Sequence, residues 1–417
     1  MPDFPSHRKC HCRVINNPQK GFVCISQLSC NLDDFVQYKI QTSSLEVMTL
    51  INPKPSNRKT MVAEAGATAP RILGLQPSAL VDHVARVDSS FLDKIPGERN
   101  GSIRVEEAEL EQILDEVRTH LLPTSGGLSP ITTLAGGSVA NTLRGLSKCF
   151  GVSCGLIGAS GSDELAQLFV RHMSKSGVKL SLLKAKDGLT AQCVCLVDAA
   201  GNRTMRPCLG TAARLTASEL GCKEKFRGYC WLVLRYGIYS LEIINEAIRL
   251  AKLEGLKISL DLASFETVRN FRAPLIELLE SRNIDLCFAN EDEATELIRG
   301  NRQVNPEACA EYLATHCQWA VVTLGSNGCI ARHGNETVRV SAISQGEAMD
   351  ATGAGDLFAS GFLYGLVKGL SLEDCCKVGS CSGGAVIRSL GGDVTPENQQ
   401  WMYKQMQMKG IPLPESH

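Results

Sequence analysis

The sequence predicts an α/β protein built on a parallel sheet that is covered by helices. From residue 231 onward, short apolar runs alternate with stretches of helical periodicity, and this alternation is typical of parallel strands connected by helices. A glycine-rich turn leads into a helix near residue 353, and a Gly-Gly pair precedes another helix near residue 137. Ligands bind at the carboxyl ends of the strands in such sheets, so we expect the functional residues there.

The expected elements follow from local patterns, taken in chain order. Residues 71–75 form a short apolar run, and residues 79–88 partly alternate between apolar and polar side chains, as strands do. The other expected strands are residues 152–157, 191–197, 203–208, 231–234, 257–261, 284–288 and 319–323. The expected helices are residues 106–120, 161–176, 241–253, 273–280 and 375–390, with further helices that begin near residues 139, 291 and 353.

Composition limits the class of protein. The chain has 417 residues, 44% of them hydrophobic and 21% charged, which suffices for one large domain or two smaller ones. A net charge of −1 gives no indication of a nucleic-acid or anionic-membrane partner, and no apolar run is long enough to span a bilayer. The eighteen cysteines are scattered through apolar segments and no secretory signal precedes them, so we expect reduced, buried thiols.

Residues 1–70 differ from the rest of the chain. Basic residues outnumber acidic ones there, Ser, Asn and Pro are frequent, and the hydrophobic periodicity is weak. We therefore predict a poorly ordered N-terminal extension, followed by a domain at residues 71–410. We expect a cytoplasmic protein, or a plastid or mitochondrial one if the extension is a targeting peptide.

The stretch from Asp350 to Phe362 carries the strongest functional signal. Two glycines flank Ala354, Asp356 follows at once, and the apolar pattern beyond it is helical. The amides of a first helical turn have no intrahelical partners and, with the helix dipole, form a site for an anion. A carboxylate beside a phosphate is suited to deprotonate an attacking hydroxyl. The alternative is an ordinary helix start, with Thr352 as N-cap and Asp356 complementing the dipole.

Two strings in this sequence resemble the signatures of one family. Asp-Ala-Thr-Gly-Ala-Gly-Asp-x-Phe-x-x-Gly-Phe at residues 350–362 resembles the C-terminal signature of the ribokinase-like (PfkB) carbohydrate and nucleoside kinases, and Gly-Gly-Ser-x-Ala-Asn-Thr at residues 136–142 resembles the N-terminal one. Residues 91–94 and 106–120 resemble the adenosine-kinase branch. The resemblance implies a three-layer α/β/α fold with a small β-sheet lid, whose strands we expect around residues 79–88 and 191–208.

The resemblance also implies an activity, which is transfer of the γ-phosphoryl group of ATP, with Mg²⁺, to a primary hydroxyl of a ribonucleoside or sugar, the 5′-hydroxyl of a ribosyl group being favoured. Asp356 would be the catalytic base, assisted by the amides of Gly353, Ala354 and Gly355. The residues implied to bind the sugar are Asp82, Gly136, Gly137 and Asn141. Those implied to bind ATP are Thr323, Gly325 and Asn290. The implied metal ligands are Glu293 for Mg²⁺ through water, and Asp350 and Thr352 for a monovalent cation such as K⁺.

Several alternatives stay open at this point. Asp82 also fits a surface acid on an edge strand, and Asn290 with Glu293 fits a helix capping box, which is compatible with a metal role. Arg203 and Arg206 fit either contacts to substrate or phosphate, or solvated charges on the lid. The acceptor is a small molecule, with a hexose, fructose or ribose as the alternative to a nucleoside. Sugar-phosphate kinases need additional cationic residues, and the sequence places none at the sugar site. A non-catalytic binding or assembly subunit is the rival of another class, and we expect a monomer or homodimer.

Overall fold

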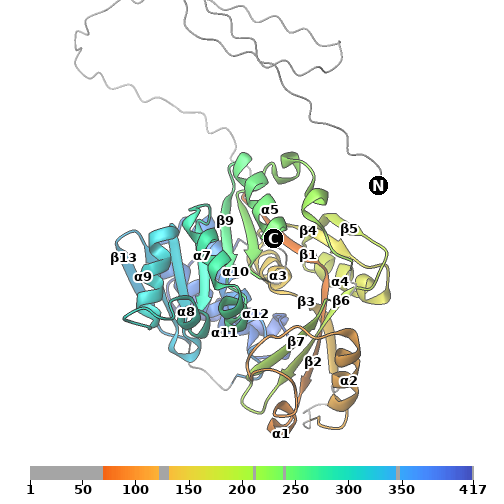
Figure 1. Ribbon diagram of the computed structural model, residues 1–417. Helices are drawn as coiled ribbons and strands as arrows, with labels where there is room; N and C mark the ends of the chain where they lie inside the picture. Colours follow the sequence, from red (N-terminus) through yellow and green to blue (C-terminus); the bar gives the residue numbers. More distant parts are fainter. Residues whose placement is uncertain (1–68, 122–130, 210–212, 238–240, 344–347, 416–417) are drawn as a thin grey trace, which may run out of the picture. The chain divides into compact units, whose positions relative to one another are not determined.

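The computed structural model describes residues 69–121, 131–209, 213–237, 241–343 and 348–415. All of them belong to one compact unit, Gly66–His417, which contains a nine-stranded sheet and a four-stranded sheet (Figure 1). Residues 1–68 of the predicted extension lie outside the described residues, so the expectation about their order stays a prediction.

The nine-stranded sheet has the order β13-β12-β11-β10-β9-β8-β1-β4-β5. The seven strands β5, β4, β1, β8, β9, β10 and β11 run parallel to one another. The strands β12 and β13 follow β11 at one edge and form an antiparallel hairpin. The strands are β1 (Arg71–Ser78), β4 (Ser153–Ser160), β5 (Lys179–Ala185), β8 (Trp231–Arg235), β9 (Lys257–Asp261), β10 (Leu286–Asn290), β11 (Trp319–Thr323), β12 (Cys329–His333) and β13 (Glu336–Val340).

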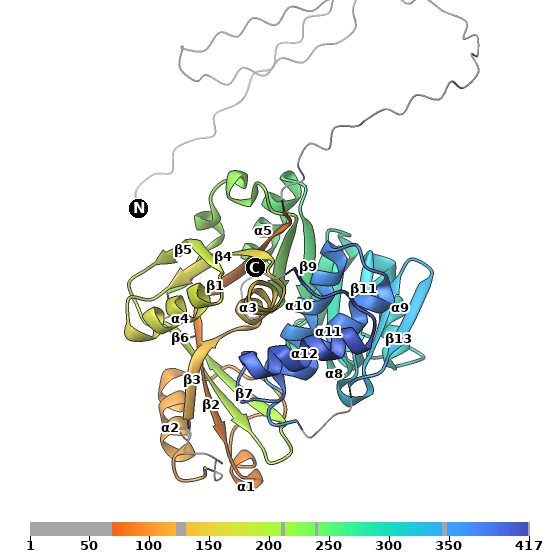
Figure 2. The same cartoon turned by 180° about the vertical axis from the view of Figure 1, so that it is seen from behind.

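Helices cover both faces of this sheet and make three layers, which Figures 1 and 2 show from opposite sides. Successive residues of one strand belong to different cores, for example Leu232 to one and Val233 to the other, because strand side chains alternate between faces. One face packs against α3 (Ser138–Phe150), α4 (Glu164–Lys175), α10 (Ala354–Val367), α11 (Leu372–Val386) and α12 (Pro396–Met408). The other packs against α5 (Leu241–Leu253), α6 (Phe265–Asn270), α7 (Arg272–Glu280), α8 (Glu291–Leu297) and α9 (Pro306–His316).

The four-stranded sheet forms the lid and has the order β3-β2-β6-β7. Its strands are β2 (Leu80–Arg86), β3 (Ile131–Gly136), β6 (Ala191–Val197) and β7 (Arg203–Cys208). The helices α1 (Ser89–Leu92) and α2 (Glu107–Val117) cover one face of the lid. Phe91 of α1 and Leu110 of α2 share a hydrophobic core there with Val194 of β6. Only Ala79 separates β1 from β2, so the chain passes directly from the large sheet into the lid and carries Asp82 with it.

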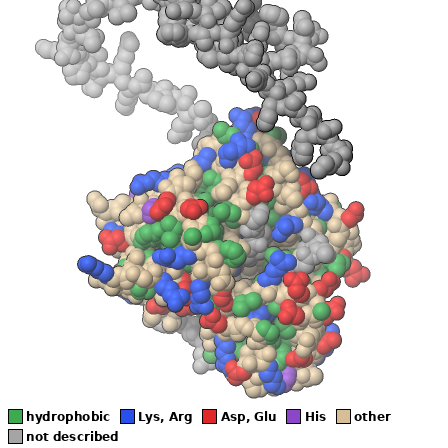
Figure 3. Space-filling view, in the orientation of Figure 1, with side chains coloured by type: hydrophobic (Ala, Val, Ile, Leu, Met, Phe, Trp, Pro, Cys, Tyr) green, Lys and Arg blue, Asp and Glu red, His purple; other side chains and the backbone are tan. Residues whose placement is uncertain are grey.

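The predicted fold class is confirmed, but several of its elements were not foreseen, among them the strands β3 and β5, the β12–β13 hairpin and the helices α9 and α12. β3 was not expected as a strand, although Ile131, Thr132 and Thr133 are β-branched residues of the kind that favour strands. The β12–β13 hairpin breaks the strand–helix alternation on which the parallel sheet was predicted. In the described part of the chain, no helix is both long and apolar enough to cross a membrane. On the face shown in Figure 3, basic and acidic side chains are interspersed rather than gathered by sign.

Candidate active site

A pocket lies where the carboxyl edge of the large sheet meets the lid. It has an empty volume of about 830 Å³ including its open mouth. Its lining combines residues from the lid, the strand ends and the starts of α3 and α10, among them Asp82, Asn141, Asp261, Glu293, Gly355 and Asp356. The pocket therefore brings together the residues of both signature strings, which are far apart in the sequence.

Helix α10 begins at the pocket with a backbone that requires glycine. Gly353 is its N-cap with φ +79°, and a Cβ there would lie 2.8 Å from Cα of Gly392. The helix geometry leaves the amides of Gly355 and Asp356 without intrahelical partners, so they can bind an anion. The amide of Ala354 was also predicted to be free for an anion, but it donates a hydrogen bond to the carbonyl of Ala351 at 3.1 Å within the turn.

Asp356 is tied directly to the first signature string. Nδ2 of Asn141 donates to Oδ2 of Asp356 at 2.9 Å, and Oγ1 of Thr142 donates to the Asp356 carbonyl at 3.2 Å. Both contacts come from the first turns of α3, which packs against α10. The carboxylate of Asp356 is thus held at the pocket by a side-chain amide through Oδ2, and no described residue hydrogen-bonds to its other oxygen.

Arg144 orients Asn141 and was not anticipated as a site residue. Its guanidinium, 2% exposed as a residue, donates to Oδ1 of Asn141 at 2.6 Å and to the carbonyl of Gly392 at 3.1 Å. With its oxygen held by Arg144, the Asn141 amide presents its nitrogen to Asp356. The signal in the sequence was a basic residue three positions after Asn141, on the same side of the helix.

Asp82 is buried at the lid side of the pocket, which excludes the alternative of a surface acid. It is 1% exposed, and its Oδ1 has no hydrogen-bond partner among the described residues. Burial raises the pKa of Asp82 to about 7, with Arg144 opposing and Asp356 adding to the rise. Gly136 leaves the room for this carboxylate, since a Cβ there would overlap it, and a Cβ on Gly137 would overlap the Gln76 amide.

The Asn290–Glu293 pair is a capping box that is also a buried acid site. Nδ2 of Asn290 donates to Oε1 of Glu293 and the Asn290 amide donates to Oε2, both at 2.8 Å. Glu293 is 4% exposed, and burial and the neighbouring Asp261 raise its pKa to about 8. Mg²⁺ keeps several of its waters in proteins. The donor set therefore fits Mg²⁺ held through water, because both carboxylate oxygens already accept a hydrogen bond from Asn290.

The two residues predicted for the ATP-binding turn lie at different places. Thr323 ends β11 and lines the pocket. Gly325 has φ +54° and is exposed two residues further on, outside the lining. Of these two residues, Thr323 therefore lies at the pocket, and Gly325 belongs to the exposed turn after it.

Asp350 and Thr352 are buried just before the start of α10, and Thr352 also lines the pocket. Oδ1 of Asp350 accepts from the Thr352 amide at 2.8 Å and Oδ2 accepts from the Gly391 amide at 2.7 Å. Oγ1 of Thr352 is buried and has no partner in the described part of the chain. A buried hydroxyl without a partner beside a carboxylate fits the ligand set of a small monovalent cation.

Three charged residues of the pocket were missed or left open. Asp261 ends β9 and Arg235 ends β8, and an ion pair of 3.8 Å joins them. Enclosure by protein raises the pKa of Asp261, with Arg235 opposing. Arg203 lines the pocket from the lid, whereas Arg206 is 1% exposed and donates to the carbonyls of residues 98, 101 and 205. The signal for Asp261 and Arg235 was their place at the carboxyl ends of strands.

Comparison with known proteins agrees with this geometry. Residues 121–399 match the pfkB family of carbohydrate kinases. An uncharacterized sugar kinase of Archaeoglobus fulgidus is 27% identical over 59% of this chain and 96% of its own. The adenosine kinase of Schizophyllum commune is 25% identical over 75% of this chain and 93% of its own.

A solved structure extends the comparison to the fold. The crystal structure of adenosine kinase from Sinorhizobium meliloti aligns with a TM-score of 0.72 and 27% identity, over 81% of this chain and 99% of that one. Kinases of this family use ATP, typically with Mg²⁺, and act on small molecules. The chain therefore belongs to the pfkB family of carbohydrate kinases, with a ribokinase-like fold, and is a phosphotransferase similar to adenosine kinases.

Proposed function

We propose that this kinase transfers the γ-phosphoryl group of ATP to the 5′-hydroxyl of a ribonucleoside. The observation that carries the proposal is the hydrogen bond between Asn141 and Asp356 at the start of α10, with Asp82 in the same pocket. One cavity thus contains the proposed carboxylate base, two backbone amides that can bind an anion, and a second carboxylate that can bind sugar hydroxyls.

In the proposed reaction, Asp356 accepts the proton of the acceptor hydroxyl as the oxygen attacks phosphorus. Asn141 holds the Asp356 carboxylate toward the acceptor, and Arg144 holds Asn141. The amides of Gly355 and Asp356 face charge that develops on the transferred group. Glu293 and Asn290 would hold Mg²⁺ through water, and the bound ion supplies neutralisation of the phosphate charges.

Sugar recognition is assigned chiefly to Asp82. Its Oδ1 has no protein partner, so it is available to accept hydrogen bonds from hydroxyls of the acceptor. Asn141, which the sequence suggested as a sugar ligand, donates one of its two amide hydrogens to Asp356 and accepts a hydrogen bond from Arg144 at its oxygen, so both of its amide atoms are oriented by the protein. We therefore propose that Asn141 positions the base and that Asp82 holds the ribose diol.

A nucleoside is favoured over a free sugar by the apolar part of the pocket. The lid contributes Leu80, Cys193, Met205 and Pro207 to the lining, and Phe288 faces it from the large sheet. An apolar lining of this kind suits a planar base better than a hydroxylated ring alone. Relatives named adenosine kinase, which align over three quarters of this chain, support the same class of acceptor.

An acceptor panel tests this proposal. Adenosine, other ribonucleosides, ribose and fructose are each incubated with ATP and the enzyme, and the release of ADP is measured. We expect a ribonucleoside to be the best acceptor. Its 2′-deoxy analogue should be at least roughly tenfold poorer in kcat/KM, because Asp82 then loses a partner. Strong activity on fructose or ribose with none on any ribonucleoside would refute the nucleoside assignment.

A phosphorylated sugar is the second candidate acceptor. Arg203 and Arg235 line the pocket, and they provide the cationic residues that the sequence did not place. Arg235 is paired with Asp261 and with the carbonyl of Ala263, which leaves Arg203 as the freer cation. Adding fructose 1-phosphate and fructose 6-phosphate to the panel separates the two candidates. Arg203→Met should abolish activity on a phosphorylated acceptor and leave a neutral acceptor's KM less affected.

A further inference from the structure

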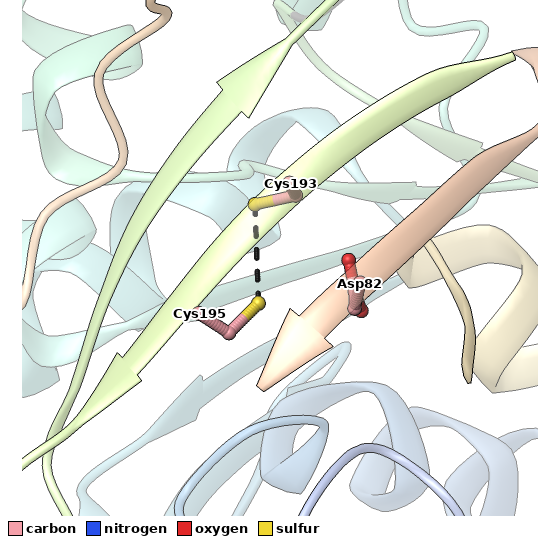
Figure 4. Close-up of side chains that lie close together, drawn as sticks. All are labelled: Asp82, Cys193 and Cys195. Carbon is pink, nitrogen blue, oxygen red and sulfur yellow. Dashed lines mark hydrogen bonds between the residues drawn. The ribbon is translucent and has the colours of Figure 1, made fainter. Parts of the chain in front are cut away.

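Two cysteines lie beside Asp82, the proposed sugar ligand, where the lid meets the pocket, and neither cysteine takes part in a chemical step of the reaction proposed above. Cys193 and Cys195 lie on one face of β6, and Asp82 lies on the neighbouring strand β2 opposite Cys193 (Figure 4). All three residues are almost completely buried. The Sγ atoms of the two cysteines are 3.9 Å apart, and one ligand atom from each of the three residues lies within 4.8 Å of the other two.

The spacing of these atoms fits a small tetrahedral metal ion. With Zn–S bonds of about 2.3 Å, two sulfurs of a tetrahedral site lie roughly 3.8 Å apart. The observed Sγ–Sγ distance of 3.9 Å matches this separation without rearrangement of β6. Two thiolates and a carboxylate are ligands of a soft or borderline cation and do not suit Mg²⁺ or Ca²⁺.

Two further observations support a ligand at this place. Oδ1 of Asp82 is buried without a hydrogen-bond partner in the described part of the chain, and such an atom is costly unless something binds it. Asp82 and Cys193 both line the pocket, so an ion can enter, and its fourth position would face the cavity. Two thiolates, a carboxylate and a divalent ion carry one net negative charge, which the neighbouring Arg144 offsets.

We propose that Asp82, Cys193 and Cys195 bind a thiophilic divalent cation of the Zn²⁺ class, and that this ion and the acceptor exclude each other. Binding replaces the two thiol protons, which pass to solvent, with metal–sulfur bonds. The exclusion arises because Asp82 cannot serve the ion and the sugar hydroxyls together. The exclusion rests on the proposed function, whereas the ion site itself does not.

Cobalt(II) titration of the reduced full-length protein tests the site without any activity measurement. One equivalent of Co²⁺ should produce a near-ultraviolet thiolate-to-cobalt charge-transfer band, and Zn²⁺ should remove it. Cys195→Ala should weaken Co²⁺ binding by at least roughly 100-fold. Loss of a residue that only hydrogen-bonds to a metal ligand can already cost that much, and Cys195 would be a ligand itself. Cys208→Ala is the matched control, because Cys208 is a buried cysteine on the opposite face of the same sheet and should leave the band unchanged.

The result that overturns the site is the absence of the band, or a band that persists in Cys195→Ala. Circular dichroism checks the fold of that variant, and Cys195→Ser, which keeps the side-chain size, should lose the band as well.

Kinetics then test the exclusion. Free Zn²⁺ fixed by a metal buffer should raise the acceptor KM of the wild type without changing the ATP KM, and Cys195→Ala, which lies outside the pocket lining, should be insensitive. A cobalt band without acceptor competition would refute the exclusion and leave the ion site. Acceptor turnover without a cobalt band would refute the ion site and leave the kinase proposal.

Discussion

At the scale of single residues, the candidate site depends on one chain of side-chain contacts. Arg144 holds the oxygen of Asn141, and the nitrogen of Asn141 holds Asp356. Arg144 and Asn141 are buried and Asp356 is partly buried, so loss of one partner leaves another unsatisfied. The chain of contacts gives Asp356 one defined orientation at the start of α10, which is what a base needs before the acceptor arrives.

Replacing the carboxylate alone tests the role of Asp356. Asp356→Asn should lower kcat by about 10²–10⁴-fold, the usual cost of losing a general base, and leave ATP binding nearly intact. The asparagine oxygen can still accept from Asn141, so the fold should survive. Steady-state kinetics and ATP titration measure the two effects.

The matched control for that variant is Asp393→Asn. Its carboxylate pairs with Lys148 at 3.1 Å outside the pocket, so kcat should stay within about twofold. If Asp356→Asn retains more than a tenth of the wild-type kcat, Asp356 is not the base.

At the scale of elements, the start of α10 is the part whose conformation and function can be separated by substitution. Gly353 needs its positive φ, but Gly355 lies in the first helical turn and a Cβ there would meet nothing within 4 Å. Gly355 nevertheless lines the pocket. A methyl group at this position would enter space that is empty in the protein and lies next to the anion-binding amides.

Gly355→Ala should therefore fold normally and lose activity. Alanine in a helix is favoured over glycine by about 0.5–1 kcal/mol, so Tm should stay equal or rise slightly. The methyl group should displace the phosphate chain and lower kcat/KM for ATP by at least roughly tenfold. Thermal unfolding and steady-state kinetics with varied ATP measure both.

Gly361→Ala in the same helix should behave in the opposite way. Its Cβ would overlap Oγ of Ser382 and lie 2.7 Å from the carbonyl of Val378, away from the pocket, so it should lower Tm. An unchanged kcat/KM in Gly355→Ala would show that the phosphates do not approach this turn.

At the scale of the whole molecule, the sequence predicted the layers and the residues of the two signature strings. The sequence singled out Asp356 and Asn141 as candidate site residues because long, specific strings surround them. Asp261 and Arg235 were not, because a single charged residue at a strand end has no local pattern and acquires meaning only beside its neighbours in the sheet. The contact between Asp82, Cys193 and Cys195 depends on the register of β2 with β6, which no periodicity reveals.

The pocket also concentrates acids whose ionisation opposes folding. Burial raises the pKa of Asp82 to about 7, burial and Asp261 raise that of Glu293 to about 8, and the pKa of Asp261 is raised as well. Between about pH 4 and pH 8 the folded protein therefore binds more protons at these groups than the unfolded chain. Their contribution to stability is complete below the unfolded pKa values and is lost as the pH rises through 7 and 8.

Asp82→Asn should consequently stabilise the ligand-free protein at pH 8 but not at pH 4, since the amide cannot ionise. A pKa that rises from 3.8 to about 7 corresponds to a difference on the order of 4 kcal/mol. Denaturant unfolding of both proteins at pH 4, 6 and 8 measures the gap, which should widen with pH. Asp88→Asn is the control in the same lid, because hydrogen bonds from Ser90 and Phe91 lower the pKa of Asp88 and it titrates below this window. If the difference in unfolding free energy between the two proteins stays constant from pH 4 to pH 8, Asp82 is ionised in the folded protein. A cation or water would then provide the interaction with Oδ1 that the described residues lack.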